Sequence, residues 1–571
     1  MTALFHPHIP AIIGETVTGR TPGSPRHLSI IVVAAAALLA LGACSGSQGG
    51  SKTSTSTGAA ATTASGSASG SSGAASSVAG APTNGVLTVG LLGDIGQPPD
   101  PDIYYANNGT AIMINTYEGL VQYRDDVSRV EIAPRLATSW TVNPGNTVFT
   151  FHLRHGVTFH DGTPFTSAAV GASFARRTAV KGGAAYMVAG VKSVATPDRY
   201  TAVVTLSAPN SAFLSYLASP FGPKMESPTA IRAHAGTDHD QKYLRSHDIG
   251  TGPYELTTAI TGTKYVLTQY PKYWGPKSPF TTVNLPVYTD AGPLELAFDH
   301  GDVSAIVAAL PSSSLKRYTS NGKVSNYFLP TLQSALLTLN PSKSLFSSVK
   351  ARTAFLQSVN QKQLVTQVLG QRSTVATTLY AKGMIPGGAD KQNISYNPAV
   401  MAAYAKTLPS GTAMTIGYAT GNPNAQQMAT ILAAQMQAIG IKATAQGYDT
   451  STVFSWPAKP TTGPDAFVDG NNGPDGGDPY MWGHVFWDKS GGIDYFSCDV
   501  PAVDADLNQA VKTGDTALYV KAAEQYSANG CYLNLSYNQD WVLAQKWLTG
   551  VPQAQNIGAN ELNFSKLGIA K

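Results

Sequence analysis

Charged residues are scarce in this chain of 571 residues, where they make up 13% of the sequence. The 38 basic and 34 acidic residues are spread along the chain without blocks of one sign. Nucleic-acid binding calls for clustered Lys and Arg, so this distribution argues against it. Because hydrophobic residues reach 43%, the chain can bury sizeable cores, and its surface must depend on uncharged polar side chains.

Long apolar runs are also missing, except near the amino terminus. The run from Leu28 to Leu41 is short for a membrane-spanning helix, which needs about 20 apolar residues. Arg20 and Arg26 precede it, and Gly42-Ala43-Cys44 follows it. A basic region, a short apolar segment and a small-residue site are typical of a secretory signal. An uncleaved membrane anchor is the alternative.

The end of this signal, L-G-A-C, resembles the lipobox of bacterial lipoproteins. The resemblance implies that residues 1–43 are a signal peptide and that Cys44 becomes the lipidated first residue. The protein is then expected on the outer face of the bacterial cytoplasmic membrane, attached through its N-terminal lipid. Residues 44–85 consist almost entirely of Ser, Thr, Gly and Ala, a composition that cannot bury a core, and we predict a disordered linker there.

Cysteine is rare, with three residues in the whole chain. If Cys44 carries lipid, Cys498 and Cys531 remain. An exported location permits disulfides, so we predict a bond between these two. Two free buried thiols are the alternative.

Catalytic signatures are mostly absent. The chain has no G-x-S-x-G elbow, no H-E-x-x-H and no G-x-x-x-x-G-K, so we predict neither a catalytic residue nor a cofactor. His152, His155 and His160 could offer nitrogen ligands to a metal. A solvated sheet face explains His152 better, because it alternates with Phe151 and Leu153, and we predict no metal site.

Hydrophobic periodicity predicts a βαβ unit over residues 414–445. A strand is followed by Asn422-Pro423, an N-cap with proline at the first helical position. Apolar residues then recur at helical spacing until Gly440, after which a second strand begins. Such a βαβ unit implies parallel strands with a right-handed crossover.

Residues 466–479 are rich in Gly, Asp and Asn and are predicted to form a loop. Glycines let a backbone approach a ligand closely, and carboxylates can bind an ammonium group by charge-assisted hydrogen bonds. An ordinary surface loop is the alternative.

Several stretches follow one another in a characteristic order: Asp100-Pro101, Tyr117–Val121, Ile132–Trp140, Thr150–Phe165, Gly250–Tyr254, Tyr273-Trp274 and Asp478-Pro479. Together they resemble the bacterial extracellular solute-binding proteins of family 5, which serve ABC importers of oligopeptides, dipeptides and nickel. The resemblance covers residues 86–571. It implies a periplasmic-binding-protein-like class II α/β fold, in which two hinged lobes and an extra subdomain enclose a ligand.

The resemblance also implies a discontinuous first lobe, made of residues 86–115, 207–331 and 531–571. The extra subdomain is expected over residues 116–206 and the second lobe over residues 332–530. The lobes are expected to close over a small molecule or peptide without changing it, and the protein to act as a monomer that delivers this ligand to ABC transporter permease subunits.

In peptide-binding members of the family, an aspartate just before the late D-P meets the peptide ammonium, and Asp475 matches that place. The other ligand-binding candidates lie on the same loop or supply aromatic walls: Asn472, Gly473, Tyr104, Tyr105, Tyr186, Trp456, Tyr480, Trp482 and Tyr537. A nickel, metallophore or other non-peptide receptor is one alternative. A surface lipoprotein enzyme acting on cell-wall peptides is another, because catalytic residues can lie far apart in sequence.

Overall fold

The computed structural model describes residues 80–106, 109–125, 130–489, 491 and 493–571. The predicted signal peptide, Cys44 and most of the predicted linker lie outside the described residues. No helix in the described ranges is long and apolar enough to cross a bilayer.

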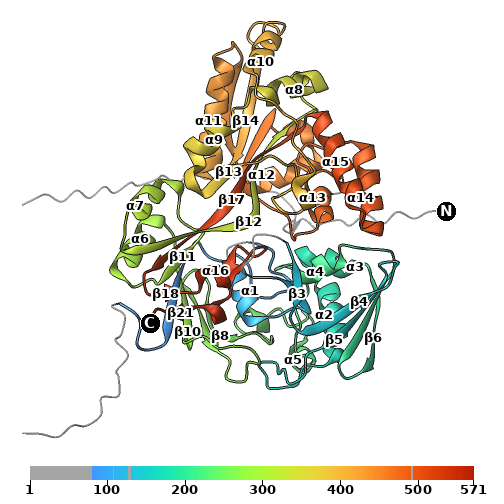
Figure 1. The fold of residues 1–571 in the computed structure, drawn as a ribbon, viewed down its shortest axis with the longest axis vertical. Helices are drawn as coiled ribbons and strands as arrows, with labels where there is room; N and C mark the ends of the chain where they lie inside the picture. Colours follow the sequence, from blue (N-terminus) through green and yellow to red (C-terminus); the bar gives the residue numbers. More distant parts are fainter. Residues whose placement is uncertain (1–79, 107–108, 126–129, 490, 492) are drawn as a thin grey trace, which may run out of the picture. The chain divides into compact units, whose positions relative to one another are not determined.

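One large sheet organises the described part of the chain (Figure 1). Its strands lie in the order β15 (Lys442–Tyr448), β14 (Ala413–Ala419), β16 (Ala466–Asn472), β12 (Val324–Leu339), β17 (Tyr532–Gln545), β11 (Ala305–Val307), β1 (Val86–Leu92), β10 (Thr282–Tyr288), β9 (Lys264–Gln269) and β8 (Tyr254–Ile260), with β13 (Ser373–Val375) added beside β17. Parallel and antiparallel pairs are mixed, which fits the predicted α/β class.

Two long strands, β12 and β17, are shared by both ends of this sheet. Their pairing beside β11 runs from Val324–Gln545 to Pro330–Gln539, and it resumes at Ser334–Tyr537 beside β16. The register breaks between Pro330 and Ser334. Pro330 has no backbone N–H to give to the ladder, so pairing is weakened at this point. A two-strand connection with such a break fits the hinge expected between two lobes.

The predicted βαβ unit is confirmed. β14 and β15 are parallel neighbours, and α11 (Pro423–Gln437) connects them. The side chain of Asn422 accepts a hydrogen bond from the Ala425 N–H at 3.0 Å, as the N-cap prediction required. Met428 and Leu432 on α11 are buried in the same apolar core as Ile416 on β14.

The prediction of a loop over residues 466–479 is wrong for its first half, which forms β16. This strand runs parallel to β14 and antiparallel to β12. Phe467 and Val468 are buried within the sheet, and Gly470 packs so tightly that a Cβ there would lie 2.9 Å from the Asn422 amide. Burial in the middle of a sheet thus outweighs a composition that resembles a turn.

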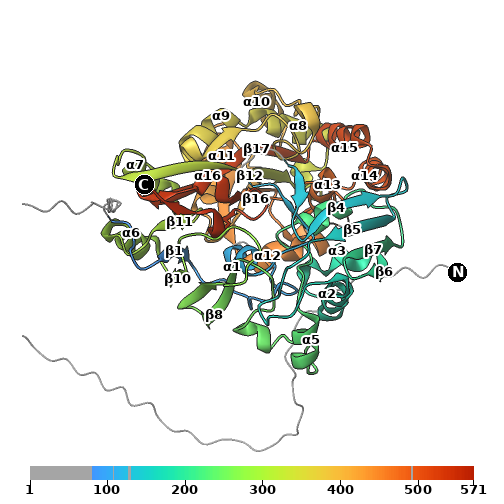
Figure 2. The same cartoon turned by 60° about the horizontal axis from the view of Figure 1, so that its bottom comes forward.

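A second, smaller sheet is antiparallel throughout, in the order β4 (Ala137–Val142), β5 (Val148–Leu153), β7 (Thr201–Leu206) and β6 (Val191–Asp198). α2 (Ser167–Val180) packs beside β6 and β7, as Figures 1 and 2 show. β4 and β5 form a hairpin, in whose turn the Asn143 side chain accepts hydrogen bonds from the N–H groups of Thr147 and Val148, both at 2.8 Å.

The remaining helices are α1 (Thr110–Thr116), α3 (Tyr186–Ala189), α4 (Phe213–Ala218), α5 (Pro228–His234), α6 (Ala291–His300), α7 (Leu315–Thr319), α8 (Val349–Ser358), α9 (Gln361–Leu364), α10 (Pro398–Ala405), α12 (Thr450–Ser455), α13 (Pro479–Phe486), α14 (Pro501–Thr513), α15 (Thr516–Asn529) and α16 (Val551–Ala554). Three short strand pairs complete the fold: β2 (Val121–Tyr123) with β3 (Ile132–Pro134), β18 (Leu548–Thr549) with β21 (Gly568–Ile569), and β19 (Gln555–Asn556) with β20 (Glu561–Leu562).

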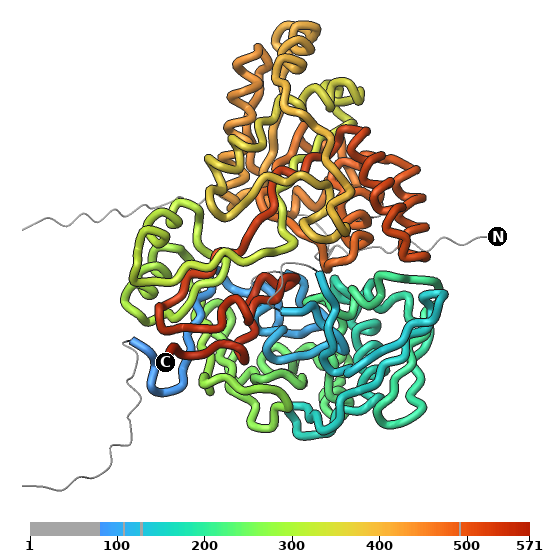
Figure 3. Tube along the Cα trace, in the orientation of Figure 1, coloured from blue at the N-terminus to red at the C-terminus, as the bar shows by residue number. Residues whose placement is uncertain are grey.

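The carboxyl-terminal segment returns to the amino-terminal elements, which Figure 3 shows as red tube beside blue. The buried Asn115 on α1 makes this contact specific. Its amide donates to Leu562 O at 2.9 Å and accepts from Phe564 N at 2.8 Å. α1 ends at Thr116, because the chain becomes extended at Tyr117, directly before Glu118.

Glu118 joins four stretches of chain in the interior. Its side chain pairs with Arg135 Nε at 2.7 Å and accepts from Thr251 Oγ1 at 2.8 Å, Trp274 Nε1 at 2.9 Å and Tyr273 OH at 3.2 Å. Glu118 is 3% exposed, so these partners replace water completely. Each partner belongs to one of the stretches that carry the family resemblance.

Cys498 and Cys531 form a disulfide bond with a Cα–Cα distance of 6.3 Å, as predicted. The bond ties the segment before α14 to the start of β17. It therefore closes a loop around both α14 and α15.

We predict that Glu118→Gln lowers the free energy of unfolding by about 3–5 kcal/mol, because it leaves the buried Arg135 charge without its partner. Urea denaturation followed by circular dichroism measures this loss. Asp499→Asn is the matched control, since it breaks the exposed Asp499–Lys489 pair at 3.0 Å and should have little effect. Equal stability of wild type and Glu118→Gln would contradict the role given to Glu118.

We predict that replacing both Cys498 and Cys531 by alanine costs about 3–4 kcal/mol in the chain-entropy model, given the 33-residue separation. Chemical denaturation with and without a reductant provides the measurement. Reductant should destabilise the wild type by a similar amount and leave the double variant unchanged.

Candidate functional site

A short glycine-rich loop between β16 and α13 forms the centre of the candidate site. Tyr123 OH accepts a hydrogen bond from Gly477 N at 2.6 Å. A Cβ on Gly476 would lie 2.6 Å from the same hydroxyl, and a Cβ on Gly477 would lie 2.3 Å from Val130. Only glycine fits at both positions, so the loop is pressed against elements that are distant in sequence.

The loop ends where Asp478 caps α13. The Asp478 carboxylate accepts from Tyr480 N at 2.9 Å, and Pro479 takes the first helical position. This cap fixes the direction in which the chain leaves the loop. The D-P pair in the sequence is therefore a helix start that positions Asp475 three residues earlier.

Asp475 is the point where three segments meet. Its carboxylate accepts a hydrogen bond from Tyr105 OH at 2.5 Å and another from Tyr186 OH. Its backbone carbonyl accepts from Ser219 Oγ at 2.5 Å. Tyr105 lies between β1 and α1, Tyr186 begins α3, and Ser219 follows α4.

The Asp475 carboxylate has no cationic partner among the described residues, so its environment favours a bound cation. Burial raises the pKa of the Asp475 carboxyl, and the hydrogen bonds from Tyr105 and Tyr186 offset part of this rise. Both partners are neutral hydroxyls, and Asp475 takes part in none of the ion pairs among the described residues. An ammonium group would supply the missing counter-charge.

Aromatic rings surround this carboxylate. Tyr105 and Tyr186 remain 37% and 36% exposed. The Tyr105 ring packs edge-on against Phe221 at 5.1 Å, and the Tyr186 ring against Tyr216 at 5.8 Å between centroids. Tyr216, Ser219 and Phe221 were not predicted as site residues, because they lie in a segment without motif or periodic signal.

Four other predicted site residues lie on elements next to this loop or along β17. Asn472 donates to the Asp469 carboxylate at 2.7 Å, and Gly473 packs on Gln333. Tyr480 stacks on His484 with 5.3 Å between ring centroids. The Tyr537 hydroxyl accepts from Thr378 N at 2.8 Å and thereby fixes the chain beside β13.

The remaining three aromatic candidates belong to the core in this structure. Tyr104 is 2% exposed, and its hydroxyl accepts from Gly109 N. Trp456 is fully buried among Phe467, Tyr495 and Phe496. Trp482 is fully buried against Phe486. Their side chains therefore offer no face to a ligand here, because large aromatic residues fill core space as readily as they line sites.

The three histidines considered as metal ligands have separate roles. His152 is exposed on β5, and His155 stacks on Tyr200 at 3.8 Å. His160 is buried, and its Nδ1 bonds Asp248. The acids Asp100, Asp102 and Glu226 do lie close together, but Arg176 Nη1 already bonds all three. Within the described ranges, that ion network accounts for the cluster without a metal.

Comparison with known proteins matches residues 131–493 to the family model of the bacterial extracellular solute-binding proteins, family 5 Middle. The chain belongs to this family. Among its relatives is a probable D,D-dipeptide-binding periplasmic protein, DdpA, of Escherichia coli K12, which is 28% identical over 413 residues, or 71% of this chain and 78% of that protein. The nickel-binding periplasmic protein of the same bacterium is 24% identical over 512 residues, or 83% of this chain and 93% of that protein.

Solved structures show the family 5 fold directly. The periplasmic binding protein DppA of Helicobacter pylori, in complex with the peptide STSA, aligns with a TM-score of 0.71. It shares 21% identity and covers 85% of this chain and 98% of its own. The two-lobe periplasmic-binding fold predicted from the sequence is therefore confirmed.

The buried His160 of this family 5 protein makes the stability of the fold depend on pH. Nδ1 bonds Asp248 and Nε2 lies 3.0 Å from Gly252 O, so both nitrogens must donate and the ring is an imidazolium. Burial lowers the pKa of His160, but the Asp248 carboxylate outweighs it and the net shift is upward from 6.5. This stabilisation is complete below about pH 6.5 and is lost as pH rises through the folded pKa.

We therefore expect His160→Gln to lower the melting temperature most near pH 5.5 and progressively less above neutrality. His152→Gln, on an exposed strand face, serves as the control and should show no such pH-dependent difference. Calorimetric scans across this pH range measure both. A difference that grows with pH would contradict an imidazolium at position 160.

Proposed function

We propose that this family 5 protein captures peptides with a free amino terminus and delivers them, chemically unchanged, to an ABC import permease. One observation carries the proposal: the Asp475 carboxylate is held by two tyrosine hydroxyls and has no cation among its partners in the described residues. A peptide ammonium must exchange its water for charged or polar partners when it is bound. Asp475, Tyr105 and Tyr186 supply such partners.

The same residues link ligand binding to closure. In the domain division expected from the family, Asp475 lies in the second lobe, Tyr105 in the first lobe and Tyr186 in the extra subdomain. A ligand that contacts all three has more partners in the closed form than in the open form. Its binding free energy then favours closure.

The similarity to DdpA favours a short peptide, since that relative is named for binding a D,D-dipeptide. The backbone of Asn472 and Gly473 offers an extended ligand further hydrogen bonds, in the manner of strand addition. A nickel or metallophore ligand is the second candidate, because the nickel-binding relative matches more of the chain at lower identity.

The location of the protein is part of the proposal. Cleavage before Cys44 and lipidation of its sulfur would hold the protein at the outer face of the cytoplasmic membrane, as a monomer on a tether of about 40 residues. A flexible linker of this length spans about 35 Å on average, which lets the binding domain meet a permease in the same membrane.

We predict that Asp475→Asn weakens binding of free-amine peptides by about 2–5 kcal/mol, or at least about 30-fold in Kd, because it removes the charge and keeps the shape of the side chain. Isothermal titration calorimetry with a peptide library and its N-acetylated counterpart measures this change. The acetylated peptides should bind the wild type and the variant equally. Asp499→Asn, at an exposed site, should retain wild-type affinity.

Equal affinities of wild type and Asp475→Asn for free-amine peptides would refute the role of Asp475. Melting scans with peptides, nickel and nickel chelates separate the two candidate ligands, since only the cognate ligand should stabilise the protein. Mass spectrometry of the recovered ligand tests the enzyme alternative. A chemically altered peptide would overturn capture without turnover.

A further inference from the structure

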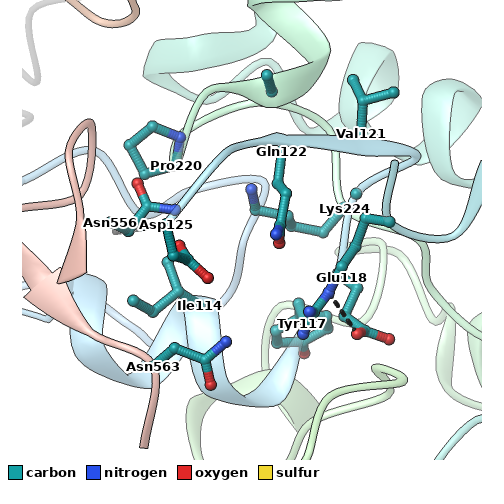
Figure 4. Close-up of a pocket in the computed structure, with 13 residues that line it drawn as sticks. Ile114, Tyr117, Glu118, Val121, Gln122, Asp125, Pro220, Lys224, Asn556 and Asn563 are labelled. Atoms are coloured by element: carbon teal, nitrogen blue, oxygen red, sulfur yellow. Dashed lines mark ion pairs between the residues drawn. The ribbon is translucent and has the colours of Figure 1, made fainter. Parts of the chain in front are cut away.

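A small polar cavity lies behind the candidate site. It has a volume of about 40 Å³ and is bounded by β2, the turn between β3 and β4 that holds Arg135, the segment around Lys224, and the carboxyl-terminal segment that carries Asn556 and Asn563. Figure 4 shows Lys224, Asp125 and Asn563 pointing into one space, with the ion pair of Glu118 marked at its edge. The cavity is too small for a peptide and plays no part in the proposed function.

The charges around this cavity do not cancel. Arg135 is paired with Glu118 at 2.7 Å, and Asp125 is paired with Lys566 at 2.7 Å. Lys224 is left over: it is 7% exposed, forms none of the ion pairs among the described residues, and donates to a neutral group, Ser219 O, at 2.8 Å. An ammonium has three donors, so two remain for other partners.

The neighbouring positive charges destabilise the protonated form of Lys224. Burial, together with the positive charges of Arg177 and Arg135, lowers the pKa of Lys224 from 10.5 to about 7. A buried charge without a partner is costly, so a protein either loses the proton or provides a counter-ion. A cavity beside such a lysine gives a counter-ion a place.

The amides at the cavity also favour an anion. Asn563 Oδ1 accepts from Ser565 N and Ser565 Oγ, and Asn556 Oδ1 accepts from Gly558 N and Ala559 N. Their oxygens are therefore occupied by their own turns. This leaves the NH₂ groups as donors, and Figure 4 shows the Asn563 nitrogen on the cavity side.

We propose that this cavity binds a small monovalent anion of the halide class, held by the Lys224 ammonium and the NH₂ groups of Asn556 and Asn563. The volume of about 40 Å³ exceeds what one water molecule needs, so a monatomic ion fits inside the cavity. The Ser219 residue that accepts from Lys224 also donates to the Asp475 carbonyl, so the anion lies next to the support of the glycine-rich loop. The anion site does not depend on which ligand the protein carries.

Thermal unfolding of the whole protein in sodium chloride, sodium bromide and sodium gluconate at equal ionic strength tests this proposal. Chloride and bromide, present at ten times their Kd, should raise the wild-type melting temperature by about 1–2 °C over gluconate at pH 6. The difference should shrink at pH 9, where Lys224 has lost its proton. Lys224→Met should abolish the difference, and Lys489→Met, at an exposed lysine, should retain it.

Crystals grown in bromide provide a second test that needs no variant. Diffraction data at the bromine absorption edge should show an anomalous peak in the cavity beside Lys224. The proposal is overturned if the cavity shows water alone, if the wild type unfolds identically in halide and gluconate, or if Lys224→Met keeps the halide response. Should Lys224→Met fail to fold, the bromide map decides.

Discussion

The buried carboxylate of Glu118 is the interaction on which this fold depends most visibly. It is the single acceptor on which Arg135, Thr251, Tyr273 and Trp274 converge, and these residues come from three regions of chain that no local structure connects. Because water is excluded, each of these donors would lose a partner if Glu118 moved. The network therefore fixes how the small antiparallel sheet is attached to the strands of the large one.

The candidate ligand site uses this rigid support in a different way. Gly476 and Gly477 let the loop before α13 lie directly on Tyr123, which brings Asp475 within reach of Tyr105 and Tyr186. The aspartate is thus held at a junction of three segments by neutral groups, which leaves its charge available. Under the proposed function, such a site would select a ligand by its charge at this one point.

Much of this arrangement could be predicted from the sequence, and the exceptions have physical causes. The unit from β14 to β15 was predictable because its cap, periodicity and stop signals agree. β16 was not, since its glycines and asparagines resemble a turn and only burial between β14 and β12 makes them a strand. Asp475 could be predicted from the D-P pair that follows it. Ser219 and Phe221 carry no local sequence signal, because only the tertiary fold brings them to the candidate site. Trp456 and Trp482 were assigned by residue type, which does not distinguish a wall from a core.

The break in β12 has a mechanical consequence. At the level where the pairing of β12 with β17 breaks, between Pro330 and Ser334, β13 pairs with the opposite edge of β17, Ser373 with Asn538 and Thr374 with Tyr537. β17 is therefore held by β13 at the same level at which the pairing of β12 is interrupted. We therefore expect the two lobes to move by rotation about the axis of β17, and not by unrestricted motion in several directions. A permease that recognises the closed form would then always contact the two lobes of the receptor in the same relative orientation.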